Sequence, residues 1–285
     1  MANKIHVFTF ATQNFLQMRK TQGICSIHRG FDSFNSFSNS DFQSDFKEKN
    51  FTTLSLERGS GYWVWKPYII LLATRIYPHE EALLYLDSGA IPIRDSSLYK
   101  SLIRDDRIHV WVEEDSRIIN WTDPNVLSAL SGEQDFTDAP MVWAGALLAR
   151  NSQNLTHFLL QWQKLCENPS YLHPETLDGY TKESGYIWHR HDQSILSILV
   201  AQNPHLFVVH SLNDGHPSAK YFDRHRNLGI TYVLSVFSFP KIRQFRRKLV
   251  SRLPRHLRIF LRSVKTNRQG RKLSKDERNS LKEIY

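Results

Sequence analysis

The stretch that decides the fold is ALLYLDSG, residues 82–89. Its first five residues are apolar, which predicts a short strand, and a run of this kind is typical of a central strand covered on both faces of an α/β sheet. Ligands of open α/β sheets bind outside the carboxyl ends of the strands. Asp87, Ser88 and Gly89 follow this strand and are therefore candidate binding residues, with the glycine allowing a ligand to approach the backbone. The alternative is an ordinary turn, because all three residue types favour turns.

Similar apolar runs elsewhere extend the same fold. Three of them read as further buried strands, residues 5–12, 108–112 and 141–150. Residues 155–166 place apolar side chains at helical spacing, which predicts a helix packed on the sheet. The first strand ends at Ala11 and Thr12, where a nucleotide-binding fold commonly meets the base or ribose, although the same residues also suit a turn.

The segment GSGYWVWKPY, residues 59–68, is the first of two clusters that lie next to predicted helices. Pro67 suits the first turn of a helix, where its missing N–H costs nothing. Lys66 would then lie beside the free N–H groups of that helix, and a cation at a helix N-terminus suits a diphosphate. The alternative is a lysine whose stem packs over tryptophan, with Trp63 and Trp65 in the core.

The second cluster is WHRHDQS, residues 188–194. The apolar residues that follow it describe one face of a helix. A polar run before a helix suits a loop that lines a cleft, so Asp192 and Gln193 are candidates to present a carboxylate and an amide to a substrate, with His191 nearby. The alternative role of Asp192 is to cap the helix.

Two further features bear on ligands and metal ions. Gly145 lies inside the predicted strand 141–150, two residues after Trp143, and a glycine within a strand indicates the close approach of a ligand or of a second backbone. Five His and Asp side chains are scattered through loop-like sequence, His210, Asp214, His216, Asp223 and His225. Imidazole and carboxylate groups bind Mn²⁺ or Zn²⁺, but this spacing matches no closed metal motif.

Cysteine content and hydropathy indicate the compartment. The chain has 285 residues and two cysteines, Cys25 and Cys166, which lie far apart. This favours a reducing compartment over a disulfide framework. The first residues do not resemble a signal peptide. No apolar run approaches the roughly 20 residues that span a bilayer. We therefore expect a cytoplasmic protein.

Charge divides the chain in two. Residues 224–285 carry 18 Lys and Arg against three Asp and Glu, whereas residues 1–223 carry 19 against 25. This predicts a domain at 1–223 and a basic helical extension at 224–285. Across residues 240–272, apolar side chains recur at helical spacing among Lys and Arg, as in helices that lie on anionic membrane surfaces. A helix packed on the acidic domain and a nucleic-acid-binding arm are the alternatives, and the long apolar side chains disfavour nucleic acid.

Three segments in order, 59–72, 82–93 and 188–199, resemble the GT-A-fold nucleotide-sugar glycosyltransferases of the bacterial polysaccharide and lipopolysaccharide type, and are similar to glycosyltransferase families eight and thirty-two. The resemblance covers most of residues 1–225. It implies a GT-A, Rossmann-like α/β fold with a mixed, mostly parallel central sheet flanked by helices. It also implies a nucleotide-diphospho-sugar donor and transfer of its sugar to a hydroxyl acceptor.

By position, Asp87 matches the first acid of the family's Asp-x-Asp motif, which normally holds the ribose and a metal-bound diphosphate. Gly89 stands where the second acid would be, so a usual direct metal ligand is missing. The resemblance implies a divalent cation, Mn²⁺ or Mg²⁺, with Asp87 as a ligand. Gly89 leaves two possibilities, an ion held by Asp87 with a later His or Asp, or an enzyme without an ion.

The other matching positions concern the nucleotide-sugar donor and the acceptor. Lys66 occupies a place suited to the donor phosphates, and Ala11 and Thr12 lie on the nucleotide side. Asp192 and Gln193 match polar positions that face the reacting sugar. The resemblance implies that the strand 141–150, with Trp143 and Gly145, lies behind the acceptor.

The sequence therefore predicts a glycosyltransferase with Asp192, Gln193 and His191 at the reaction centre. We expect its acceptor to be a glycan or glycolipid in surface polysaccharide synthesis, with the extension on the inner face of a membrane. Two alternatives stay open. One is a non-catalytic nucleotide- or sugar-binding protein on the same fold, which is consistent with Gly89 in place of the second acid. The other is a protein that binds nucleic acid through its basic extension.

Overall fold

The apolar part of the fold-deciding stretch forms the central strand β3, Ala82–Leu86, and all five of its side chains are buried. It pairs in parallel with β1, Ile5–Phe10, and antiparallel with β7, Ala146–Arg150. Since β1 also pairs with β2, Ser33–Phe37, on its other edge, strand order reverses between β1 and β3. Such a reversal is where open α/β sheets bind ligands, at the carboxyl ends of the strands.

The computed structural model describes residues 4–174, 185–212 and 221–224. Apart from Arg224, the predicted extension at 224–285 lies outside these residues, and so does the stretch 240–272 that we expect to bind a membrane. The metal candidates Asp214, His216 and His225 lie outside them as well. No helix among the described residues has the length and apolar character that crossing a bilayer requires.

In the described part of the chain, the main sheet has seven strands in the order β2-β1-β3-β7-β5-β6, with β8 beside β5. The remaining strands are β5, Ile108–Arg117, β6, Pro140–Val142, and β8, Phe207–Ser211. Five strands run in one direction, and β6 and β7 run in the other. The mixed, mostly parallel sheet that the sequence predicts is confirmed. A second sheet pairs β4, Ala90–Pro92, with β9, Phe222–Arg224.

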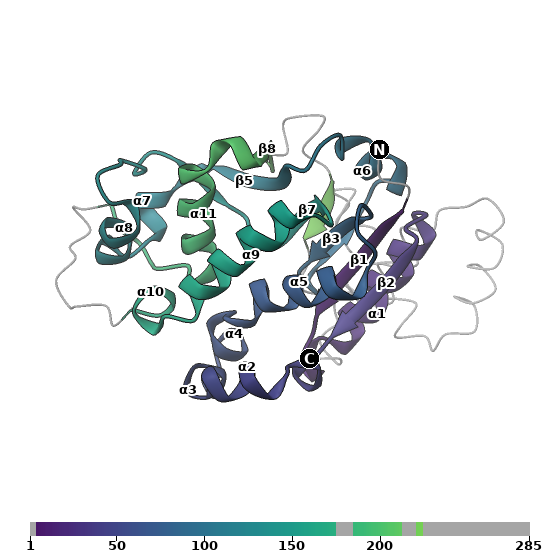
Figure 1. Ribbon diagram of the computed structural model, residues 1–285, viewed down its shortest axis with the longest axis horizontal. Coiled ribbons are helices and arrows are strands. Elements are labelled where there is room, and N and C mark those ends of the chain that lie inside the picture. The colour runs from purple at the N-terminus through teal and green to yellow at the C-terminus, as the bar shows by residue number, and fades with distance from the viewer. Residues whose placement is uncertain (1–3, 175–184, 213–220, 225–285) are drawn as a thin grey trace, which may run out of the picture. The chain divides into compact units, whose positions relative to one another are not determined.

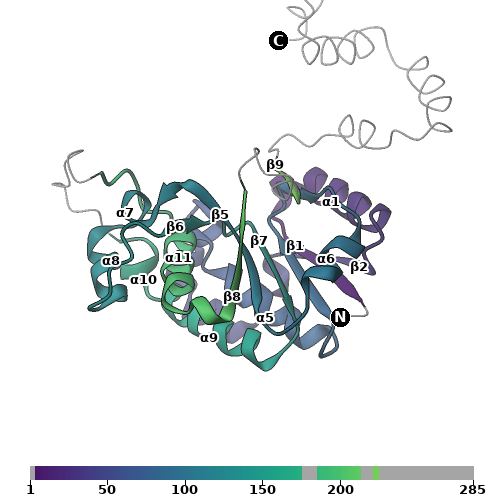
Figure 2. The ribbon, with the colours of Figure 1, turned by 90° about the horizontal axis from the view of Figure 1, so that it is seen from above.

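Helices cover both faces of the main sheet. The longer ones are α1, Leu16–His28, α5, Trp65–Ile76, α9, Gln153–Cys166, and α11, Asp192–Gln202. The shorter ones are α2, Ser44–Lys49, α3, Phe51–Leu54, α4, Gly59–Tyr62, α6, Ser96–Leu102, α7, Ile118–Trp121, α8, Pro124–Ser131, and α10, Pro169–Leu172. Three 3₁₀ turns complete the described elements: η1, Gln13–Phe15, η2, Asn39–Asp41, and η4, Pro204–Leu206. Helices α5, α9 and α11 lie on the near side of the sheet in Figure 1, and α1 and α9 lie on opposite sides in Figure 2.

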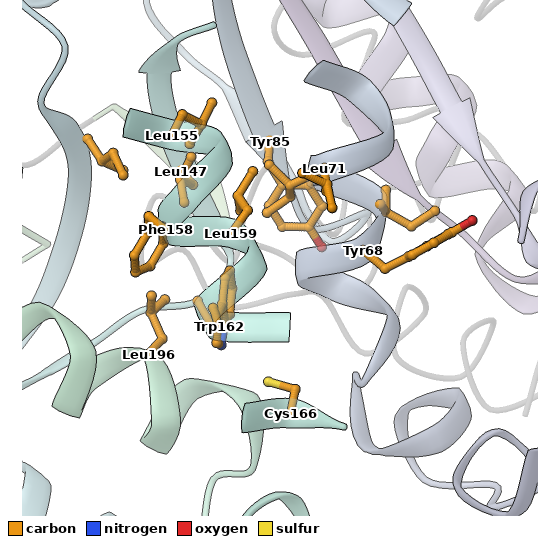
Figure 3. Close-up of a cluster of buried hydrophobic side chains, with 14 of the residues drawn as sticks. Tyr68, Leu71, Tyr85, Leu147, Leu155, Phe158, Leu159, Trp162, Cys166 and Leu196 are labelled. Carbon is orange, nitrogen blue, oxygen red and sulfur yellow. The ribbon is translucent and has the colours of Figure 1, made fainter. Parts of the chain in front are cut away.

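The near face carries the larger apolar core. On α9, Leu155, Phe158, Leu159 and Trp162 follow the spacing of one helix face and are all buried. Ser152 begins this helix by accepting a hydrogen bond from the Leu155 N–H with its side chain. Figure 3 shows this face of α9 packed toward α5, with the Tyr85 ring of β3 between them.

The predicted strand 141–150 is wrong as a single element. It is divided into β6 and β7, and residues 143–145 connect the two. The Trp143 ring folds back so closely over Gly145 that a Cβ at Gly145 would lie 2.3 Å from it. Gly145 thus allows the close approach of the Trp143 side chain, and its carbonyl accepts a hydrogen bond from the backbone N–H of Asp87 at 2.9 Å. The approach of a ligand to Gly145 stays a prediction. The predicted first strand is also shorter than expected, because β1 ends at Phe10.

Candidate active site

The site is built on an ion-pair cluster of Lys66, Asp87 and Asp192. The Lys66 Nζ lies 2.9 Å from Asp192 Oδ2 and 3.3 Å from Asp87 Oδ1. It also donates a hydrogen bond of 3.1 Å to the Ala144 carbonyl, in the connection between β6 and β7. The beginning of α5, the end of β3 and the beginning of α11 therefore meet at one ammonium group. The structure brings together the acid after β3 and the acid that begins α11, which are 105 positions apart in the chain.

Burial makes this cluster electrostatically strong. The side chains of Lys66 and Asp192 are 3% and 4% exposed, whereas that of Asp87 is 35% exposed. Burial raises the pKa of Asp192 to about 6, although the charge of Lys66 acts to lower it. Burial acts to lower the pKa of Lys66, but the two carboxylates outweigh it and hold that pKa above its ordinary value. Two buried charges thus stabilise each other, and the outer carboxylate, Asp87, is the one that faces solvent.

Hydrogen bonds from neighbouring elements fix Asp87 in place. The Tyr85 hydroxyl donates to Asp87 Oδ1 at 2.6 Å. The side-chain amide of Gln22, on α1, donates to the Asp87 and Ala90 carbonyls at 3.1 and 2.8 Å. The Asp87 N–H donates to the Gly145 carbonyl at 2.9 Å. Asp87 does open a turn, since its carbonyl accepts from the Ala90 N–H, but its carboxylate takes no part in that turn.

The backbone that leads to Lys66, the short element α4 with Trp63 after it, is a left-handed turn. Five consecutive residues have positive φ: Gly59 (59°), Ser60 (54°), Gly61 (92°), Tyr62 (51°) and Trp63 (62°). This conformation costs an L-residue other than glycine roughly 1–2 kcal/mol, so runs of this kind are rare. Strain of this sort persists where the surroundings enforce it, and it clusters at functional sites. The turn brings Tyr62 and Trp63 against His191 and delivers Lys66 to the first turn of α5.

The predicted capping role of Asp192 is wrong. His191 precedes α11 at φ 53°, and Asp192 is the first residue of the helix, with its carboxylate at Lys66. Pro67 does lie in the first turn of α5, as expected. The ring that the Lys66 ammonium approaches is that of Tyr85, with Nζ 5.9 Å from its centroid.

His191 lies inside an aromatic cluster. Its ring centroid is 4.5 Å from that of Tyr62 and 5.9 Å from that of Trp63, and it is 5% exposed. Burial lowers the pKa of His191 to about 3, so the ring is neutral and its Nδ1–H donates to the Leu172 carbonyl at 2.8 Å. Its Nε2 has no hydrogen-bond partner among the described residues, and neither has the buried Nε2 of Gln193.

A cavity of about 610 Å³ lies at the carboxyl ends of β1 and β2. The predicted residues Ala11 and Thr12 line it on the β1 side. Its other lining residues are Gln13, Asn14, Leu16, Arg19, Ser38, Asn39 and Ser40. Helix α1 connects the cavity with the cluster, because Arg19 lines the cavity and Gln22, one turn later, holds the Asp87 carbonyl. Arg19 and Asn39 were not among the residues predicted from the sequence. The signal for Asn39 was its position two residues after β2, whereas Arg19 lies on α1, nine residues after β1, and has no such signal.

Gly89 and Trp143 are two further predicted residues that the structure describes. A Cβ at Gly89 would meet the Met18 Cε at 3.5 Å, an ordinary contact, so packing among the described residues does not require glycine there. Trp143 lies between Gly145 and Phe222, with ring centroids of Trp143 and Phe222 5.8 Å apart. The acceptor-side role of Trp143 and Gly145 and the donor role of Ser88 and Gly89 stay predictions.

The carboxylates of Asp87 and Asp192 do not leave a place for a divalent cation between them. The Lys66 ammonium already lies between Asp87 and Asp192, where such an ion would be shared. Within residues 4–174, 185–212 and 221–224, no three His, Cys, Asp or Glu side chains form a group that could hold an ion. His210, one of the candidates, instead pairs with His109 at 2.9 Å. Asp87 as a metal ligand stays a prediction.

Neither a protein-family model nor a curated protein matches this sequence. Among solved structures, the chain is similar to several glycosyltransferases. One is the galactosyltransferase LgtC in complex with donor and acceptor sugar analogues, with 12% identity and a TM-score of 0.44 over 84% of this chain and 99% of that one. Mouse xyloside xylosyltransferase 1 shares 11% identity at a TM-score of 0.41, over 74% and 86% of the two chains. A glycosyltransferase involved in glycosylation of the major capsid of PBCV-1 shares 11% at 0.40, over 73% and 82%.

Proposed function

We propose that this chain is a glycosyltransferase that moves a sugar from a nucleotide-diphospho-sugar donor to a hydroxyl group of an acceptor. The observation that carries the proposal is the buried Lys66–Asp87–Asp192 cluster at the carboxyl end of β3, connected through α1 to a cavity of about 610 Å³. A pocket of this size, next to polar groups with a shifted pKa, has the features of a ligand site for a small molecule.

The nucleotide end of the donor belongs in the cavity. The ends of β1 and β2 supply hydroxyl and amide groups from Thr12, Ser38 and Asn39 for the ribose and base. Arg19 is the cation that lines this cavity, and its guanidinium suits the negative charge that grows on the diphosphate as the sugar leaves. Lys66 was the cation that the resemblance offered for the phosphates, but its ammonium lies 2.9 and 3.3 Å from two carboxylates.

The donor sugar belongs at the ion-pair cluster. Carboxylates are strong hydrogen-bond acceptors, so Asp87 and Asp192 suit sugar hydroxyl groups. Lys66 holds both carboxylates in place, and its charge opposes the effect of burial on the pKa of Asp192. Gln193 follows with an amide whose Nε2 is buried and has no partner among the described residues. This amide is the polar group best suited to the reacting sugar. His191 acts as a positioning residue beneath the cluster, because its ring is neutral and packed between aromatic side chains.

The Asp87→Ala variant tests the site. We expect it to lose donor binding and to slow sugar transfer by about 100-fold, because it removes the outer carboxylate of the cluster. Donor binding is measured as the thermal shift produced by a panel of UDP-, GDP- and dTDP-sugars, and transfer is measured with and without Mn²⁺. Asp138→Asn, at an exposed position away from the cluster, is the control. Undiminished donor binding in Asp87→Ala would contradict the assignment, and donor binding without any turnover would favour the non-catalytic alternative.

The basic extension at 224–285 bears on the acceptor and on membrane binding. The excess of Lys and Arg in residues 224–285 supports an acceptor that is a glycan or glycolipid built at an anionic membrane surface. We expect the full chain to sediment with vesicles that contain phosphatidylglycerol and to remain in solution with neutral phosphatidylcholine vesicles. Sedimentation that does not depend on anionic lipid, or binding to RNA that falls steeply with salt in place of it, would contradict the membrane role.

A further inference from the structure

Trp188 is a large apolar side chain held at the surface by a fixed loop. It is 49% exposed, and the neighbouring Ile187 is 59% exposed. The loop before α11 is nevertheless tied to α7, since the Ile187 N–H donates to the Asn120 carbonyl at 2.7 Å and the Arg190 N–H donates to the Trp121 carbonyl at 3.0 Å. An indole presented on a fixed backbone loses little conformational entropy when a ligand covers it.

Arg58 lies over this indole. Its guanidinium carbon is 5.3 Å from the centroid of the Trp188 ring, and the side chain is exposed. It forms no ion pair with a carboxylate among the described residues. Arg190 gives the contrast: its guanidinium lies 3.7 Å over Trp121 and is bound to Glu113 at 2.6 Å. Arg58 therefore keeps hydrogen-bond donors for a ligand.

Two chain segments join this surface to the ion-pair cluster. The left-handed turn leads from Arg58 to Lys66, and the end of the loop leads from Trp188 to Asp192. The segments meet at the Lys66–Asp192 contact of 2.9 Å and again at the Arg58–Trp188 contact of 5.3 Å. Between these points, the His191 ring packs on Tyr62 and Trp63. The segments form one continuous wall that runs from the cluster to the surface.

We propose that Trp188 and Arg58, at the outer end of this wall, form a platform that binds a sugar residue of the acceptor. The proposal rests on the proposed function. A sugar ring is apolar on its C–H face and polar at its edge, so it can stack on an indole while its oxygen atoms accept hydrogen bonds from a guanidinium. The platform sets which glycan is aligned with the cluster; it takes no part in bond cleavage.

Fluorine NMR of the full chain labelled with 5-fluorotryptophan tests the platform directly. The Trp188 resonance is assigned as the one missing from Trp188→Phe. Two probes are used, lactose as a neutral disaccharide and digalacturonic acid as an acidic one. We expect at least one probe to shift this resonance, and Arg58→Ala to weaken that binding by about ten-fold. Phe51→Ala, which removes another exposed aromatic side chain (74% exposed), should leave the titration unchanged.

Two further measurements keep the outcomes distinct. A Trp188 resonance that neither probe moves at about 100 mM, well above a millimolar dissociation constant, would overturn the platform. So would a Trp188 indole that acrylamide does not quench, because another segment of the chain would then cover it. The nucleotide-sugar thermal shift tests the proposed function separately: Trp188→Ala should retain the shift of the unmodified chain, and a chain that binds no donor refutes the transferase even if the platform binds sugar.

Discussion

Replacing Lys66 by methionine should destabilise the protein by about 3–5 kcal/mol at neutral pH, the largest effect that we expect from any single side chain here. Methionine keeps the length of the stem but leaves two carboxylates facing each other without a cation. Asp192 is 4% exposed and cannot regain its hydration, so its ionised form carries most of the cost. Urea denaturation of the full chain measures the difference in unfolding free energy.

The pH dependence of this loss identifies its cause. Without Lys66, the folded-state pKa of Asp192 rises further above its unfolded value, because the charge that now opposes burial is gone. A carboxyl with a raised folded pKa stabilises the fold while it is protonated, and this contribution is lost as pH rises through the folded pKa. The destabilisation of Lys66→Met should therefore be small near pH 4 and grow toward pH 7. A loss that does not change with pH would indicate lost packing rather than an unpaired charge.

Two variants control this prediction. Lys100→Met makes the same substitution in the Lys100–Asp32 pair, whose nitrogen–oxygen distance is also 2.9 Å but whose side chains are 25% and 30% exposed. It should cost about 1 kcal/mol or less, as exposed pairs do. The double variant Lys66→Met with Asp192→Asn should recover part of the stability, because an amide replaces the unpaired carboxylate. If Lys66→Met and Lys100→Met cost the same, the cluster is not the source of the effect.

The sequence predicts the α/β fold and much of the site, because both follow from local rules. The apolar run 82–86 indicates a central strand, and a carboxylate after such a strand lies at the edge where ligands bind. The polar run before α11 marks Asp192 in the same way. That these two acids share one lysine was not predictable, since the burial of Lys66 depends on Ala144 and Asp192, which are 78 and 126 positions away. A lysine at a helix N-terminus looks the same in sequence whether it meets a diphosphate or a carboxylate.

The errors have a common physical origin in side-chain packing. Gly145 indicated the close approach of another group, and the group nearest to it is the ring of Trp143, two positions away. The connection that places this ring also divides the predicted strand into β6 and β7. His191 was predicted at the reaction centre, and its aromatic neighbours bury its ring. The two glycines at 59 and 61 were visible, but a run of five positive φ angles requires tertiary contacts to hold Ser60, Tyr62 and Trp63 in place.

The left-handed turn should not tolerate a side chain at Gly61. Gly61 has φ +92°, and a Cβ there would lie 2.9 Å from both the Leu54 Cα and the Thr53 carbonyl oxygen, which are backbone atoms that cannot rotate away. We expect Gly61→Ala to destabilise the protein by about 3 kcal/mol, from backbone strain together with this clash.

Gly132 provides the matched control for Gly61. It also has a positive φ, +60°, but nothing lies within 4 Å of a Cβ at that position. Gly132→Ala should therefore show backbone strain without a clash, about 1–3 kcal/mol, since its ψ of −124° lies outside the left-handed helical region. Urea denaturation measures both variants. Because the turn delivers Lys66 to Asp87 and Asp192, Gly61→Ala should also lose the nucleotide-sugar thermal shift, whereas Gly132→Ala should keep it. A Gly61→Ala protein that keeps both its stability and the nucleotide-sugar thermal shift would mean that the turn tolerates a side chain at Gly61.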